Sequence, residues 1–181
     1  MKVHNSNEGE NDKRPGRNSC CSGSSAPDEG GRRHVLFICT GNLCRSPMAE
    51  YLFRHHMGPD LTWRASSAGI SAPDGVPAST LAVQLLREKG INLTPHRSQC
   101  VTKRLVNSAD LIVVMTDSHA GEMIKRFPKA RDKVFLLKSF GAESPGGDTR
   151  DPMGLSEDMY GKILEEIDEA LLDLFVYLRS C

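Results

Sequence analysis

The sequence predicts a three-layer α/β/α fold with a four-stranded parallel sheet. Short apolar runs alternate along the chain with longer segments of helical pattern, as expected when helices cover both faces of a parallel sheet. The run 111–115 is apolar without interruption, which predicts a central strand buried on both faces. The first run, 35–38, leads into a tight turn and then a helix start. In such a fold, ligands are expected beyond the carboxyl ends of the strands.

The predicted strands are apolar or β-branched segments that end near turn-forming residues. They span residues 35–38, 62–68, 111–115 and 134–137. The predicted helices are segments whose apolar residues recur with helical spacing. They span residues 46–57, 78–89, 101–107, 116–127 and 156–178. Gly58-Pro59 and Gly90 are stop signals for the first two helices, and Thr116 or Asp117 is expected to cap the fourth.

Composition and charge are those of an ordinary soluble domain. The 181 residues include 23 basic and 23 acidic side chains, so no net field favours nucleic acid. No apolar run approaches the roughly 20 residues needed to span a bilayer, and no membrane contact is expected. Residues 1–33 lack Leu, Ile, Phe, Tyr and Trp, which predicts a disordered N-terminal tail. Residues 34–181 are then the folded domain.

The cysteines predict neither a disulfide framework nor a metal site. No secretory signal is visible in the sequence, so we expect a reducing, cytoplasmic setting. Cys39 and Cys44 do not have the spacing of a zinc knuckle, and no second ligand pair follows. The Cys20-Cys21 pair lacks a membrane-adjacent context, and Cys181 does not complete a prenylation box.

The stretch 39–46, Cys-Thr-Gly-Asn-Leu-Cys-Arg-Ser, is predicted to form an anion-binding loop. Gly41 and Asn42 are residue types that accept left-handed backbone angles, so the chain can fold back sharply. Pro47 fits the first turn of a helix, where its missing N–H costs nothing. The loop then presents free backbone N–H groups at the positive end of a helix dipole. Phosphate is the expected anion.

Cys39 and Arg45 flank this loop and are the first two catalytic candidates. Helix N-terminal amides, the Arg45 guanidinium and the Ser46 hydroxyl all favour a thiolate at Cys39, which is the nucleophilic form. The same amides and guanidinium would hold phosphoryl oxygens and stabilise the charge that develops on them. Cys44 lies inside the loop and is positioned by sequence to trap an oxidised Cys39 as a disulfide.

Asp151 is the third catalytic candidate. It lies in the loop after the fourth predicted strand, which should reach the same sheet edge as the Cys39 loop. A carboxylic acid there can protonate a leaving group and afterwards deprotonate the attacking water. His96, in a polar loop segment, is a candidate for a supporting role, whereas His55-His56 is interpreted as a solvated pair.

These residues resemble the low-molecular-weight protein tyrosine phosphatase family. Residues 39–46 match its C-x5-R-[ST] signature in its usual N-terminal position, and Asp151-Pro152 matches its late Asp-Pro loop. Further likeness is found at residues 67–69, 96–98 and 115–116, and the resemblance covers residues 35–178.

The resemblance implies a four-stranded parallel sheet, a phospho-cysteine mechanism, a phosphorylated protein as substrate and no cofactor or metal. It implies Cys39 as nucleophile, Arg45 as phosphate ligand and Asp151 as general acid and base. The remaining residues of the loop are expected to bind the substrate phosphate or support the thiolate: Thr40, Gly41, Asn42, Leu43, Cys44 and Ser46.

Two features of the sequence disagree about the substrate. Members of the family that act on phosphotyrosine usually carry a bulky aliphatic residue where this chain has Leu43, whereas its protein arginine phosphatases typically carry Thr there. The sequence after Asp151-Pro152 is Met153-Gly154, which resembles the arginine branch more. We give Leu43 more weight because it lies in the loop, and because a thioether at Met153 can still pack on an aromatic ring. Phosphotyrosine is therefore predicted, with phosphoarginine as the alternative.

Two other functional classes are less compatible with the sequence. A thiol-dependent arsenate reductase needs resolving cysteines, and besides Cys44 the domain offers only Cys100 and Cys181. A non-catalytic phosphate-binding module would predict a damaged set of catalytic residues, but Cys39, Arg45 and Asp151 are all present.

Overall fold

A computed structural model describes residues 31–58, 62–141 and 146–180. The predicted tail lies outside these residues except for 31–33. The strands are β1 (Arg33–Cys39), β2 (Trp63–Gly69), β3 (Leu111–Val114) and β4 (Val134–Leu136). The helices are α1 (Arg45–Met57), α2 (Thr80–Glu88), α3 (Lys103–Ser108), α4 (Asp117–Arg126) and α5 (Glu157–Arg179), with 3-10 turns η1 (Pro128–Lys133) and η2 (Leu137–Ser139).

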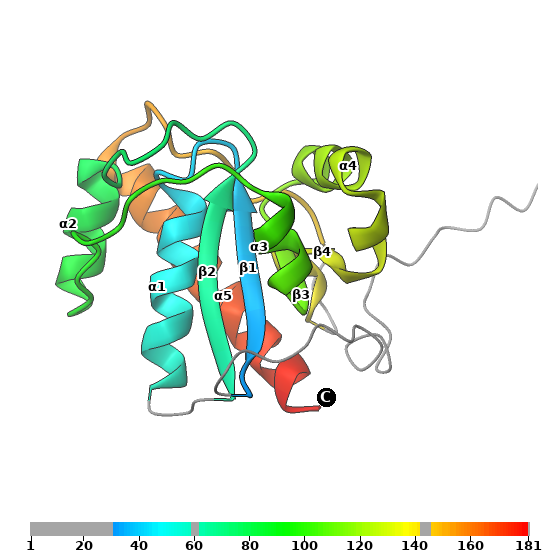
Figure 1. Cartoon of the computed structure of the whole chain (residues 1–181). Coiled ribbons are helices and arrows are strands. Elements are labelled where there is room, and N and C mark those ends of the chain that lie inside the picture. The colour runs from blue at the N-terminus through cyan, green and yellow to red at the C-terminus, as the bar shows by residue number, and fades with distance from the viewer. Residues whose placement is uncertain (1–30, 59–61, 142–145, 181) are drawn as a thin grey trace, which may run out of the picture.

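The four strands form one parallel sheet in the order β2-β1-β3-β4, which confirms the predicted fold class. β1 and β3 are the central strands, and the side chains of β3 are all buried. The register pairs Val35 with Ala65 on one side and with Leu111 on the other. Because all strands run the same way, their carboxyl ends share one edge of the sheet, at the top of Figure 1.

Alternate residues of β1 face two separate hydrophobic clusters. Val35 and Phe37 belong to the cluster formed with α1, α2 and α5. Leu36 and Ile38 belong to the cluster formed with α3 and α4. In Figure 1, α3 lies in front of the sheet and α5 behind it. The sheet is therefore covered on both faces, which explains why its central strands are continuous apolar runs.

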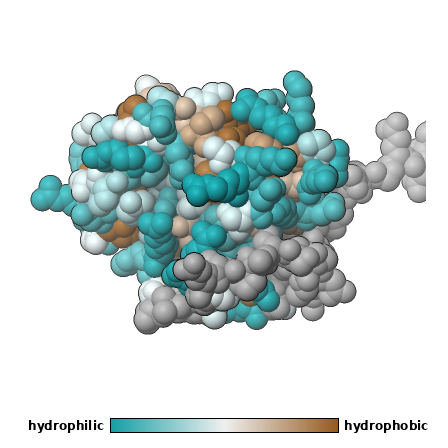
Figure 2. All heavy atoms as spheres, viewed as in Figure 1, coloured by the Kyte–Doolittle hydropathy of each residue, from teal (hydrophilic) through white to brown (hydrophobic). Residues whose placement is uncertain are grey.

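The predicted helices are all present, with ends that differ by one or two residues. Polar caps explain several starts: Ser79, Thr102, Thr116 and Ser156 each accept a hydrogen bond from a backbone N–H in the first turn. α1 begins at Arg45 rather than Ser46, and its N-cap residue, Cys44, makes no side-chain capping bond. None of the described helices combines the length and the apolar character needed to cross a membrane. Figure 2 shows this face of the molecule as mainly hydrophilic, with small apolar patches.

Candidate active site

The phosphate loop, residues 39–46, connects the end of β1 to the first turn of α1. Asn42 has a φ of 55°, a left-handed angle of the kind that its residue type was expected to accept. Gly41, the other residue type in the loop that accepts such angles, is not among the residues with positive φ. A Cβ at Gly41 would meet only the Leu43 side chain, at 3.8 Å, so the turn depends on Asn42 alone.

Cys39 lies at the base of this loop and is 3% exposed. Its Sγ accepts a hydrogen bond from the backbone N–H of Asn42 (3.3 Å) and lies 3.0 Å from Ser46 Oγ. Both neighbours belong to the loop, and both can donate to a thiolate. The structure therefore brings together the predicted nucleophile and two of the groups predicted to support it.

Asn42 is held from three directions. Its side-chain Nδ2 donates to Ser46 Oγ and to Ser67 Oγ, both at 2.9 Å, and its Oδ1 accepts from the backbone N–H of Gln99 at 3.0 Å. His96 Nε2 lies 2.8 Å from the Asn42 carbonyl oxygen, so this histidine supports the loop as the sequence suggested. These bonds offset the cost of the left-handed backbone at Asn42.

The end of β2 presses directly on the loop. A Cβ at Gly69 would lie 2.5 Å from the Thr40 carbonyl oxygen and 2.9 Å from the Asn42 nitrogen. No side chain fits there, because real Cβ atoms do not approach backbone atoms so closely. Glycine at position 69 thus sets the separation between the second strand and the phosphate loop.

Arg45 and Asp151 meet at the mouth of the loop. Arg45 Nη2 forms an ion pair with Asp151 Oδ2, and Nη1 donates to the carbonyl oxygen of Thr149 at 3.1 Å. The Thr149 N–H donates in turn to the Met115 carbonyl oxygen at 2.7 Å, which fixes the Asp151 loop at the end of β3. The Arg45 side chain is 5% exposed and that of Asp151 is 51% exposed. The carboxyl group can therefore exchange protons with water.

Cys44 is enclosed by a second set of hydroxyl groups. Its Sγ lies 2.8 Å from the Tyr160 hydroxyl and donates to Ser79 Oγ at 3.3 Å. Burial raises the pKa of the Cys44 thiol. The protonated form is thus favoured at Cys44, and its predicted role in trapping an oxidised Cys39 stays a prediction.

His119, in the first turn of α4, connects the loop to the end of β3. Its Nε2 lies 2.9 Å from Thr40 Oγ1, and its Nδ1 lies 2.8 Å from Thr116 Oγ1. Burial, with a smaller contribution from the Arg45 cation, lowers the pKa of His119 to about 4. The ring is therefore neutral at physiological pH and does not compete with Arg45 for an anion.

Several supporting residues were not singled out from the sequence. They are Glu50, His119, Thr149 and Tyr160. Each comes from a different element and reaches the loop only through tertiary contacts. Ser67 was part of the family likeness at residues 67–69, but the sequence assigned it no role in the loop.

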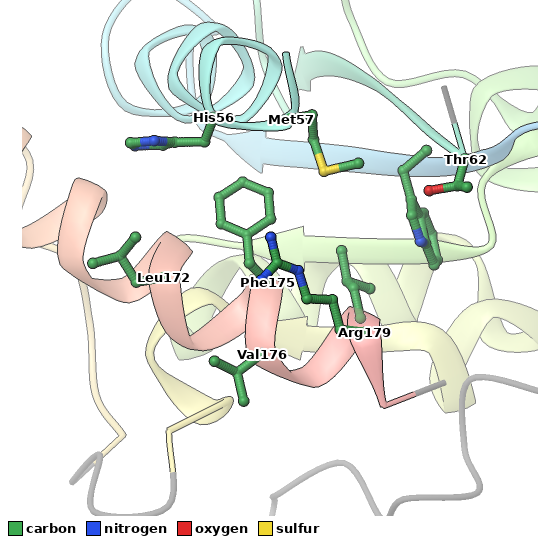
Figure 3. Close-up of a pocket in the computed structure, with 9 residues that line it drawn as sticks. His56, Met57, Thr62, Leu172, Phe175, Val176 and Arg179 are labelled. Carbon is green, nitrogen blue, oxygen red and sulfur yellow. The ribbon is translucent and has the colours of Figure 1, made fainter. Parts of the chain in front are cut away.

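Other polar groups and cavities lie away from this site. His56 Nε2 bonds Asp168 Oδ1 at 2.6 Å, and the residues described include no group of His, Cys, Asp and Glu suited to a metal ion. A cavity of about 440 Å³ is lined by Phe175 of α5 and by Trp63, among others. Figure 3 shows the Phe175 side chain among the residues that line this cavity. Trp63 begins β2 whereas Gly69 ends it beside the loop, so about 20 Å of strand separates this cavity from Cys39.

Comparisons with known proteins agree with this geometry. The family model described as low molecular weight phosphotyrosine protein phosphatase matches residues 34–180. A protein-arginine-phosphatase of Bacillus subtilis is 41% identical over 147 residues, which are 81% of this chain and 97% of that protein. A probable low molecular weight protein-tyrosine-phosphatase, EpsP, of Ralstonia solanacearum is 38% identical over 74% of this chain and 90% of that protein.

Solved structures give the same result. The YwlE arginine phosphatase from Geobacillus stearothermophilus superimposes with a TM-score of 0.75 at 37% identity, covering 81% of this chain and 93% of that one. A low molecular weight protein tyrosine phosphatase from T. tengcongensis gives 0.75 at 38% identity, covering 79% and 97%. The phosphate loop, the parallel sheet and these matches together show that the chain belongs to the low molecular weight phosphotyrosine protein phosphatase family.

Proposed function

We propose that this protein hydrolyses phosphotyrosine in protein substrates through a phospho-cysteine intermediate. The observation that carries the proposal is the convergence of three groups on one loop. Cys39 lies at its base, the Arg45 guanidinium lines it, and Asp151 lies at its mouth in contact with Arg45. The family membership supports a phosphatase, and the choice of substrate rests on the residues around the mouth.

In the first step, the Cys39 thiolate attacks phosphorus and the bond from phosphorus to the tyrosine oxygen breaks. Asp151, as the carboxylic acid, donates its proton to that oxygen, so a neutral phenol leaves. Arg45 and the loop N–H groups hold the phosphoryl oxygens, where negative charge is concentrated. A bound phosphate competes with Asp151 for the guanidinium, which has five N–H donors to share.

In the second step, water attacks the phospho-cysteine and Asp151, now a carboxylate, accepts its proton. The bond from sulfur to phosphorus breaks, inorganic phosphate forms, and the Cys39 thiolate is restored. Asn42 N–H and Ser46 Oγ lie beside the sulfur and stabilise it as a leaving group. This chemistry uses only side chains and water, so we propose no cofactor.

Leu43 favours an aromatic substrate. Its side chain is partly buried and packs against the core cluster at the rim of the loop. An apolar side chain there gains contact with a phenyl ring but gives no acceptor to a guanidinium. Met153, 57% exposed beside the general acid, adds a thioether that can pack on the same ring.

Phosphoarginine is the second candidate substrate. The observation that favours it is the identity of about two residues in five with proteins named protein-arginine-phosphatase. The Asp151-Pro152-Met153-Gly154 sequence points the same way. Both substrates fit the same two-step chemistry, because in each case Asp151 would protonate the leaving atom.

We further propose that residues 34–181 form the catalytic domain and residues 1–33 a tail, and that the protein acts in the cytoplasm. A reducing compartment keeps Cys39 available as a thiolate. A phosphorylated protein is the proposed partner.

The direct test is to assay the purified protein on a phosphotyrosine peptide and on a phosphoarginine protein. We expect hydrolysis of the first to exceed that of the second, and the reverse order would make this a protein arginine phosphatase. Replacing Cys39 by Ser should abolish both activities. A Cys39→Ser protein that retained substantial turnover would rule out the phospho-cysteine mechanism.

A further inference from the structure

Glu50 of α1 is a buried carboxyl group that the mechanism above does not use. It is 6% exposed, its Oε2 accepts a hydrogen bond from Ser67 Oγ at 2.6 Å, and its Oε1 pairs with Arg54 Nη2 at 2.7 Å. The pKa of Glu50 is raised, chiefly by burial, and the Arg54 charge and the Ser67 hydroxyl offset part of that rise. A buried carboxyl group is costly unless it is paired and hydrogen-bonded, so its position calls for an explanation.

A continuous chain of hydrogen bonds joins Glu50 to the nucleophile. Ser67 Oγ, which donates to Glu50, accepts from Asn42 Nδ2 at 2.9 Å. Asn42 Nδ2 also donates to Ser46 Oγ at 2.9 Å, and Ser46 Oγ lies 3.0 Å from Cys39 Sγ. The chain passes from α1 through β2 to the phosphate loop, and Glu50 itself has no bond to Cys39.

The hydrogen bonds from Asn42 to Glu50 have defined directions. The backbone N–H of Gln99 donates to Asn42 Oδ1, which fixes the orientation of the Asn42 amide. The two hydrogens on Asn42 Nδ2 are therefore donated to Ser67 Oγ and Ser46 Oγ. Ser67 Oγ already accepts from Asn42, so its own hydrogen goes to Glu50. Ser46 Oγ likewise accepts from Asn42, so its own hydrogen is available to Cys39 Sγ at 3.0 Å or to the Ala68 carbonyl oxygen at 3.5 Å.

We propose that Glu50 is a positioning residue that keeps this chain directed toward the sulfur of Cys39. An ionised carboxylate only accepts hydrogen bonds, so it compels Ser67 to donate to it and to accept from Asn42. Without that acceptor, Ser67 no longer has a fixed orientation, and Asn42 loses one of the bonds that hold it. The inference rests on the proposed function of Cys39 as the nucleophile.

The alternative role for Glu50 is to stabilise α1 through its ion pair with Arg54. That pair is one turn of helix apart, and Arg54 also donates to the Ala65 carbonyl oxygen at 2.9 Å. The Arg54 side chain is 51% exposed, and partly exposed pairs of this kind contribute little to stability. The chain offers a matched set of variants that separates the two roles.

Glu50→Gln replaces the carboxylate acceptor with an amide of the same shape. Ser67→Ala interrupts the chain of hydrogen bonds and leaves the ion pair between Glu50 and Arg54. Arg54→Gln removes the ion pair and leaves the hydrogen bonds of the network. Because the Arg54 charge lowers the pKa of Glu50, kcat of this variant is compared with wild type at alkaline pH, where the carboxyl group is ionised in both. For each variant and the wild-type full chain, we would measure kcat on an aryl phosphate, the thermal unfolding midpoint, and the pH dependence of alkylation by iodoacetamide. Mass spectrometry would locate the modification at Cys39, because Cys44 and Cys100 are also free thiols.

We expect Glu50→Gln and Ser67→Ala to lower kcat about tenfold, since each disturbs about one hydrogen bond that acts on a charged group. In both, the midpoint of Cys39 alkylation should move up by about one pH unit. Arg54→Gln should leave kcat and the alkylation midpoint close to wild type. Retention of wild-type kcat and alkylation in folded Ser67→Ala would overturn the proposal, and so would an equal loss in Arg54→Gln.

Two features keep the result interpretable. If Glu50→Gln does not fold, Ser67→Ala decides the question, because it removes only a hydroxyl group. The pH profile of alkylation depends on the Cys39 thiol and not on turnover. It therefore tests the hydrogen-bond chain even if the wild-type protein hydrolyses neither phospho-substrate. Failure of the proposed function would then appear as inactive wild-type protein with a shifted alkylation midpoint in the variants.

Discussion

The phosphate loop has two sides that differ in chemistry and in exposure to water. At its mouth, Arg45 and Asp151 are charged and in contact, and about half of the Asp151 side chain is exposed. At its rear, Asn42, Ser46 and Ser67 form an almost dry network of neutral groups. In the proposed mechanism the mouth exchanges protons with solvent during each turnover, whereas the rear holds the sulfur in one place. Substitutions on the two sides should therefore lower activity for different reasons.

The largest expected loss of kcat is at the mouth of the phosphate loop. Asp151→Asn removes the proton donor, and loss of a positioned acid typically costs about 10²- to 10⁴-fold. We expect kcat to fall in that range while inorganic phosphate still competes for the site, because Arg45 and the loop amides remain. Asp148→Asn, an exposed carboxylate of the same loop that accepts from the Asp117 N–H, is the matched control. Near-normal turnover in Asp151→Asn would assign the acid to another residue.

A rear substitution should misplace the loop without removing any reacting group. Gly69→Ala puts a methyl group 2.5 Å from the Thr40 carbonyl oxygen, so the strand end or the loop has to shift. Displacement of a catalytic group by about 1 Å can cost about a hundredfold, and we expect kcat to fall by up to that factor, with a lower thermal midpoint. Gly121→Ala, in α4 with nothing within 4 Å of the new methyl group, should instead stabilise the protein. Equal behaviour of the two variants would contradict the close approach at Gly69.

The two sides also differ in how far the sequence predicts them. Cys39, Arg45 and Asp151 were identified because the first two belong to one contiguous motif and the third follows a strand that ends at the same edge. Gly69 and Ser67 depend on the pairing of β1 with β2, which places Cys39 opposite Gly69 and Phe37 opposite Ser67. Sequence pattern predicts that both strands exist but does not fix their register.

The same distinction applies to the backbone. The elements were predictable because their apolar periodicity is strong, and Thr116 as the cap of α4 followed from local chemistry. The backbone conformation of Gly41 could not be predicted from the sequence, because glycine permits a left-handed angle without requiring it. At Asn42 the left-handed backbone angle is held by hydrogen bonds with Ser67, Gln99 and His96, which are all remote in sequence.

His119 lies at the junction of the two sides and predicts a pH dependence of stability. Its pKa is lowered to about 4 in the folded protein, chiefly by burial, from about 6.5 in the unfolded chain. As the pH falls from 6.5 toward 4, only the unfolded state takes up this proton, so the folded state loses about 3 kcal/mol from this group.

Urea unfolding at several pH values would measure this loss. In His119→Gln the fall in unfolding free energy between pH 6.5 and 4.5 should be smaller than in wild type, because the titrating group is gone. His55→Gln is the control for loss of an exposed histidine. If His119→Gln loses stability as steeply as wild type over this range, the ring is not held neutral by its surroundings.

The smallest expected effect concerns the rim, where the loop meets the rest of the substrate. Leu43→Thr replaces an apolar contact with a hydroxyl that can accept a hydrogen bond from a guanidinium. We expect the ratio of kcat/KM for phosphotyrosine to that for phosphoarginine to fall about tenfold, the size expected for one hydrogen bond or a few methylene contacts. Leu43→Ile keeps an aliphatic side chain of the same volume and should hold the wild-type ratio. The two variants share the phosphate loop and the Arg45–Asp151 pair, so a change confined to Leu43→Thr places substrate selection at the rim. An equal ratio in both would move substrate selection to the Asp151 loop, where Met153 is a large side chain exposed to solvent.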